Sequence, residues 1–123
     1  MPRVVHFEIN VDKPERAIKF YNKVFDWKIE KWGSDEQNYW MVTTGPDKEP
    51  GINGALMKRM DSKATTVNSI DVPSVDDFVA RVTKAGGKVF APKMSIPGVG
   101  YMAYCQDTEG NTFGLWQADK TAK

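Results

Sequence analysis

Two ionisable side chains near the start of the chain could do acid–base chemistry. His6 and Glu8 are two residues apart, and in a strand such residues project from the same face. His6 is the only histidine of the 123 residues. An imidazole beside a carboxylate can act as a general acid–base pair or bind the polar group of a ligand. The same pair could equally form a structural hydrogen bond or lie in a subunit interface, and the sequence leaves these alternatives open.

Aromatic and glycine residues on predicted strands are the other candidates for a ligand site. Trp40, Tyr101 and Trp116 could line a pocket, because aromatic walls suit flat organic ligands, or they could fill the core. Gly54 and Gly114 lie within predicted strands. Glycine there allows close approach of a ligand or of another backbone, or it marks a bulge.

Composition excludes several classes of function. Cys105 is the only cysteine, so no disulfide within the chain is possible, and we expect a buried small residue rather than a nucleophile. The formal net charge is +1 with both signs interspersed, so nucleic acid is not an expected partner. No apolar run is long enough to span a membrane, and the first residues lack the apolar segment of a signal peptide. We therefore expect a cytoplasmic protein.

The pattern of the chain repeats once, with an offset of about 61 residues. Predicted helices begin at 12–14 and at 74–77, where Asp12 and Ser74 are the expected caps and precede helical stripes of apolar side chains. One predicted strand precedes each helix and three follow it. The strands are expected at 4–11, 26–32, 39–44 and 52–56 in the first copy, and at 65–72, 87–93, 100–105 and 112–116 in the second.

A single α+β domain over residues 1–123 is expected, built from two tandem βαβββ modules. They cover about 1–57 and about 65–119, with a polar linker at about 57–64. One helix covers only one face of a four-stranded sheet. The modules are therefore expected to form a curled eight-stranded mixed sheet around a concave pocket, with both helices outside. The segment Lys93–Gly100 could be a lid over that pocket or an ordinary connection.

This arrangement resembles the vicinal-oxygen-chelate superfamily, which includes glyoxalase I, extradiol dioxygenases and bleomycin-resistance proteins. The opening motif is the strand His6–Val11 followed by Phe20-Tyr21 and by Phe25-Asp26-Trp27. The closing motif is the segment 107–115, Asp-Thr-Glu-Gly-Asn-Thr-Phe-Gly-Leu. The chain is most similar to small glyoxalase-related proteins of unassigned activity.

The resemblance implies a divalent metal on four strand positions. Carried over to this chain, those positions hold His6, Gly54, Val67 and Gly114. Only His6 among them can bind a metal, whereas a catalytic zinc usually has about three protein ligands. We therefore expect no family-type metal and no other cofactor.

The favoured function is binding of a small aromatic or polar organic ligand in the trough, without metal. An alternative is a lyase or isomerase related to lactoylglutathione lyase, with Glu8 and His6 as acid and base. A further alternative is a dimeric interaction module, since the resemblance implies a homodimer, with Trp27 and Trp32 as candidate interface residues. The candidate ligand contacts are His6, Glu8, Trp40, Gly54, Tyr101, Gly114 and Trp116.

Overall fold

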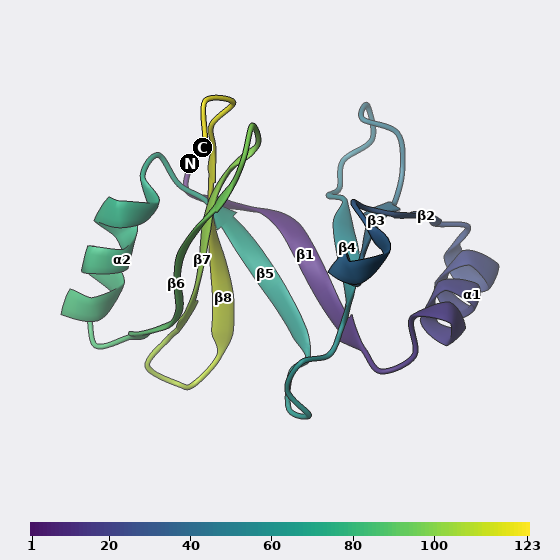
Figure 1. Cartoon of the computed structure of the whole chain (residues 1–123), viewed down its shortest axis with the longest axis horizontal. Coiled ribbons are helices and arrows are strands. Elements are labelled where there is room, and N and C mark those ends of the chain that lie inside the picture. Colours follow the sequence, from purple (N-terminus) through teal and green to yellow (C-terminus); the bar gives the residue numbers. More distant parts are fainter. The chain divides into compact units, whose positions relative to one another are not determined.

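The computed structural model describes residues 1–123 and has eight strands and two α-helices. Figure 1 labels the elements along the chain. Their order is β1 (Arg3–Val11), α1 (Pro14–Phe25), β2 (Lys28–Lys31), the short 3-10 helix η1 (Asp35–Gln37), β3 (Tyr39–Thr43), β4 (Gly54–Lys58), β5 (Thr66–Asp71), α2 (Val75–Lys84), β6 (Lys88–Ile96), β7 (Gly100–Gln106) and β8 (Thr112–Ala118).

The duplicated βαβββ order and the α+β class with a mixed sheet are confirmed. The chain divides into two compact units. The N-terminal unit is His6–Thr66, and the C-terminal unit is Val67–Lys123 together with Met1–Val5. In each unit the first strand pairs in parallel with the last, and the strands between them pair in antiparallel. None of the helices is both long and apolar enough to cross a membrane.

The N-terminal unit has the strand order β2-β3-β4-β1. Its core contains Val11, Val42 and Leu56, against which side chains of α1 such as Ile18 and Tyr21 pack. The amphipathic stripe of α1 thereby covers one face of this sheet. Phe7 and Ile9 of β1 join the same cluster, so the odd-numbered residues of β1 face the helix.

The start of α1 differs from the expectation. Lys13, not Asp12, occupies the N-cap position, and no side chain caps the first turn. Asp12 instead accepts a hydrogen bond from Arg59 at 3.0 Å. Pro14 still stands in the first turn, where a missing N–H costs nothing.

The C-terminal unit has the order β5-β8-β7-β6, and α2 packs on β6, β7 and β8 (Figure 1). Ser74 caps α2 as expected, because its hydroxyl accepts from the Asp77 N–H at 3.1 Å. The core contains Val72, Val75, Ala103, Cys105 and Leu115.

The segment Lys93–Gly100 is an ordinary hairpin connection and not a lid. β6 continues to Ile96, and Met94, Ser95 and Ile96 pair with residues of β7. Only the turn between Ile96 and Gly100 lies outside the strands. Most of the backbone in this segment is therefore committed to the sheet.

Candidate functional site

The polar side chains of β1 lie on the sheet face opposite α1. Since Phe7 and Ile9 pack toward the helix, His6, Glu8 and Asn10 project from the other face. Glu8 is only 2% exposed, and His6 is half-buried. The expectation that His6 and Glu8 share this face is confirmed.

A hydrogen-bond chain joins these two residues through Tyr39 of β3. The Tyr39 hydroxyl donates to Glu8 Oε2 at 2.6 Å, and His6 Nε2 lies 2.9 Å from the same hydroxyl oxygen. β4 lies between β3 and β1 and places Ala55 opposite Glu8. The Tyr39 side chain therefore reaches across β4 to Glu8.

Burial lowers the pKa of His6 below its ordinary value, and the negative charge of Glu8 offsets part of this effect. The imidazole is therefore neutral near pH 7, with one protonated and one unprotonated nitrogen. A neutral imidazole can accept a hydrogen bond or a proton, which an imidazolium cannot.

Tyr39 was not among the residues predicted from the sequence. The alternation of side chains along β3 could have indicated its orientation, because Tyr39 and Met41 face away from the helix while Trp40 and Val42 face toward it. The sequence contains the tyrosine, but the contact depends on strand order and register.

Trp40 and Tyr101 are both oriented opposite to the expectation. Trp40 packs into the core beneath α1, and the Lys31 ammonium lies 5.3 Å from its ring centroid. Tyr101 packs against the core beneath α2, and the Lys93 ammonium lies 4.4 Å from its ring centroid. The face that each ring takes depends on strand register, which the sequence leaves open, and the structure places both rings on the helix side instead of the face expected to bind a ligand.

Gly54 also faces the helix side. A Cβ atom placed on Gly54 would lie 2.4 Å from the Phe7 carbonyl oxygen and 2.5 Å from the Phe7 ring. The glycine therefore lets Phe7 pack against the strand, rather than opening a ligand site. The neighbouring residue on the opposite face is Ala55, which pairs with Glu8.

Gly114 and Trp116 share the face of the C-terminal unit opposite α2, as expected. Leu115, between them, lies in the helix-side core. Gly114 lies against Ser69, whose hydroxyl oxygen would be 2.9 Å from a Cβ at that position. Tyr104 alternates onto this face as well, because Ala103 and Cys105 face the core.

The side chains present do not fit the metal that the fold family implies. No group of three or more His, Cys, Asp or Glu side chains is placed to hold a metal ion. His6 and Glu8 supply two donors, while Gly54, Val67 and Gly114 supply none. Two ligands fall short of the usual three.

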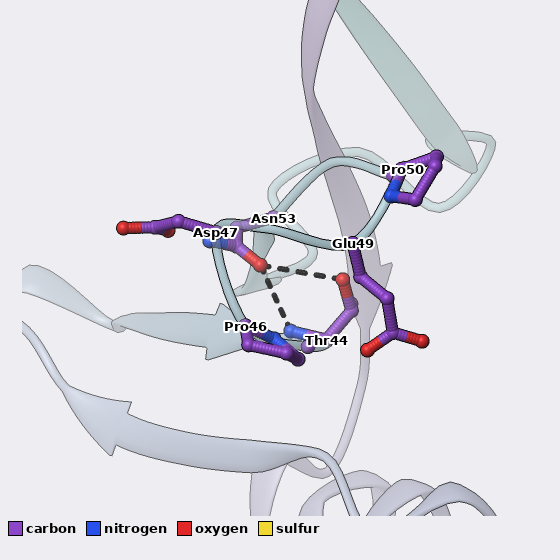
Figure 2. A pocket seen from close by; sticks show the side chains of 8 residues that line it. Thr44, Pro46, Asp47, Glu49, Pro50 and Asn53 are labelled. Carbon is purple, nitrogen blue, oxygen red and sulfur yellow. Dashed lines mark hydrogen bonds between the residues drawn. The ribbon is translucent and has the colours of Figure 1, made fainter.

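The loop between β3 and β4 encloses a hollow of about 150 Å³ lined by Asp47 and Glu49, among others. Figure 2 shows that Asn53 accepts from both the backbone and the hydroxyl of Thr44, at 2.9 and 3.2 Å. The carboxylates of Asp47 and Glu49 point in different directions (Figure 2). They do not converge on one point as ligands of a single cation would.

Comparisons with known proteins agree with this architecture. Residues 3–115 match the sequence profile of the Glyoxalase/Bleomycin resistance protein/Dioxygenase superfamily. The chain is 30% identical over 112 residues to "Putative glyoxylase CFP32" of Mycobacterium bovis (strain ATCC BAA-935 / AF2122/97), a match covering 85% of this chain and 41% of that protein. The chain thus spans less than half the length of that relative.

A shorter relative and a solved structure align over most of their lengths. The "Glyoxylase-like domain-containing protein" of Didymella fabae is 30% identical over 112 residues, covering 88% of each chain. Methylmalonyl-CoA epimerase from Mycobacterium tuberculosis has a TM-score of 0.67 at 15% identity, over 94% of this chain and 87% of that one. At that identity the likeness shows the fold alone. On the evidence of the profile and of the Didymella fabae relative, the chain belongs to the glyoxalase/bleomycin resistance protein/dioxygenase superfamily.

Proposed function

We propose that this protein binds a small organic ligand, without a divalent metal, on the sheet face opposite α1. The polar end of the ligand lies at His6 and Glu8, held in place by Tyr39. The observation that carries the proposal is the buried carboxylate of Glu8, joined to a tyrosine and a neutral imidazole on one sheet face.

The free-energy cost of burying the Glu8 carboxylate supports a functional reason for this hydrogen-bond network. Burying a carboxylate costs several kcal/mol unless it is well hydrogen-bonded, and an apolar residue of similar size is usually cheaper. Buried polar groups that a fold could do without are concentrated at functional sites. Gly114 and Trp116, on the corresponding face of the C-terminal unit, remain proposed ligand contacts. The competing interpretation is that the network only stabilises the sheet.

A binding screen separates these two interpretations. Thermal-shift and calorimetric measurements on a panel of aromatic metabolites and antibiotics should yield at least one compound that binds the metal-stripped protein. Its affinity should fall about tenfold in Tyr39→Phe, the equivalent of one hydrogen bond. Tyr21→Phe is the matched control, because the Tyr21 hydroxyl has no hydrogen-bond partner. A broad panel without a single binder contradicts the proposal.

A second candidate is a lyase or isomerase that transfers a proton next to a carbonyl group. The neutral imidazole of His6 and the carboxylate of Glu8 favour it, and the fold likeness to an epimerase is consistent by analogy. Such a reaction also needs a hydrogen-bond donor or other electrophile to stabilise the enolate. The Tyr39 hydroxyl cannot serve as that donor while it donates its hydrogen bond to Glu8. We therefore rank it below binding.

Activity assays test the second candidate directly. We expect no lactoylglutathione formation from methylglyoxal and glutathione above the rate without protein. Hydrogen–deuterium exchange at the α-carbon of thioesters and 2-oxo compounds, followed by NMR, covers the wider reaction class. Exchange abolished by His6→Gln or Glu8→Gln would replace binding with catalysis as the function.

We also propose a homodimer in a reducing, cytoplasmic setting. Phe20 and Phe25 of α1 are more than half exposed, which supports association through apolar surface. Of the two tryptophans predicted for an interface, Trp27 stacks on Tyr21 beside the core and Trp32 is exposed. Light scattering at high protein concentration tests this, and a monomer contradicts it.

A further inference from the structure

We infer that His6 Nδ1 is the atom that accepts a hydrogen bond from the ligand, and that Tyr39 is the positioning residue that leaves this nitrogen free. The ligand class that follows is a compound with an N–H or O–H donor on an apolar body. This inference rests on the proposed function, which it deepens by assigning the polarity of the contact.

The direction of the hydrogen-bond chain fixes the imidazole tautomer. The Tyr39 hydroxyl has a single proton, which it donates in the hydrogen bond to Glu8 Oε2, 2.6 Å away. The hydroxyl oxygen then has only lone pairs to offer to His6 Nε2, at 2.9 Å. Nε2 must therefore carry the ring proton, which leaves the lone pair of the neutral imidazole on Nδ1.

This lone pair is accessible. Every fully buried side-chain nitrogen and oxygen atom in the structure has a hydrogen-bond partner. His6 Nδ1 has no partner, and His6 makes no interaction besides those already described. Nδ1 is therefore open to solvent, at the end of a chain whose other end is buried.

Charge determines which donors fit. Glu8 places a negative charge one hydroxyl group away from the imidazole, and burial opposes protonation of His6. An anionic group would meet a lone pair and a nearby carboxylate, whereas a neutral or cationic donor meets an acceptor. Met41, which is 37% exposed on the same sheet face, offers apolar contact to the rest of the ligand.

The first part of the test reads the tautomer. Because the chain has a single histidine, ring-15N-histidine labelling of the whole protein gives one pair of ring signals. We expect Nε2 to be protonated and Nδ1 unprotonated in the wild type and in Tyr21→Phe. In Tyr39→Phe we expect both tautomers, since the acceptor for Nε2–H is gone. A purely structural role of Tyr39 would not change the tautomer, and a wild-type ring protonated on Nδ1 overturns the inference.

The second part uses three probes that share one ring and differ in polar group: benzylamine, benzyl alcohol and benzoate. We expect the first two to shift the His6 Nδ1 resonance, and benzylamine to bind at least about tenfold more tightly than benzoate. Tighter binding of benzoate overturns the inference but leaves ligand binding intact. Binding of none of the three, with the tautomer as expected, contradicts the proposed function instead.

Discussion

Replacing Tyr39 by phenylalanine tests the hydrogen-bond chain between His6 and Glu8. The change removes one oxygen atom, which donates to Glu8 at 2.6 Å and accepts from His6 at 2.9 Å. Because Glu8 is only 2% exposed, water cannot readily replace the lost donor. A hydrogen bond to a charged group contributes about 1.5–3 kcal/mol, and one between neutral groups about 0.5–1.5 kcal/mol. We expect Tyr39→Phe to lower the free energy of unfolding by about 2–4 kcal/mol.

Urea unfolding followed by tryptophan fluorescence and circular dichroism measures this difference. Tyr21→Phe is again the control and should cost less than about 0.5 kcal/mol, because its ring stacking is kept and no hydrogen bond is lost. A double-mutant cycle with Glu8→Gln should give a coupling of about 1–3 kcal/mol between positions 39 and 8. A Tyr39→Phe variant as stable as Tyr21→Phe, or a coupling near zero, would show that the hydrogen bonds of Tyr39 do not stabilise the fold.

Three further predictions follow from the same structure. Gly54→Ala should lower the free energy of unfolding by about 1–3 kcal/mol, because its Cβ would overlap Phe7; in Gly45→Ala the new Cβ meets only an ordinary contact at 3.5 Å, so equal losses in denaturant unfolding would contradict the strand register. Because the pKa of His6 is lowered from 6.5 on folding, the unfolded chain takes up the proton first, and stability should fall as pH drops through 6.5 until the folded pKa is passed. When the free energy of unfolding is measured between pH 5 and pH 8, the His6→Gln variant should lack this fall. A His6→Gln profile identical to that of the wild type would count against a buried neutral His6. Cys105 is 0% exposed, and burial raises the pKa of its thiol. Thiol reagents should therefore modify it only in denaturant. Rapid labelling of the native protein would contradict the buried position of Cys105.

The duplicated architecture could be predicted from the sequence because it depends on local patterns. The two helices each carry an apolar stripe, and Ser74 signals its cap directly. The spacing of these helices and of the strands around them follows the repeat. Tertiary contacts override such signals at single positions, as at Asp12, which pairs with Arg59 instead of capping α1.

The candidate site could be predicted only in part. The shared face of His6 and Glu8 follows from the alternation of a single strand. The Tyr39 contact does not, because it requires the strand order that places β4 between β3 and β1. Trp40 and Gly54 show how a one-residue error moves a side chain to the opposite face, since both lie on the helix side.

Ligand binding at His6 and Glu8 should need no metal. The most direct measurement is calorimetric titration of the tightest-binding compound of the aromatic panel into chelator-treated protein, and into the same protein reloaded with zinc, nickel or iron. We expect equal dissociation constants in all samples and no stoichiometric metal uptake at micromolar concentrations. Binding that appears only after reloading, together with one metal ion retained per chain, would contradict this expectation.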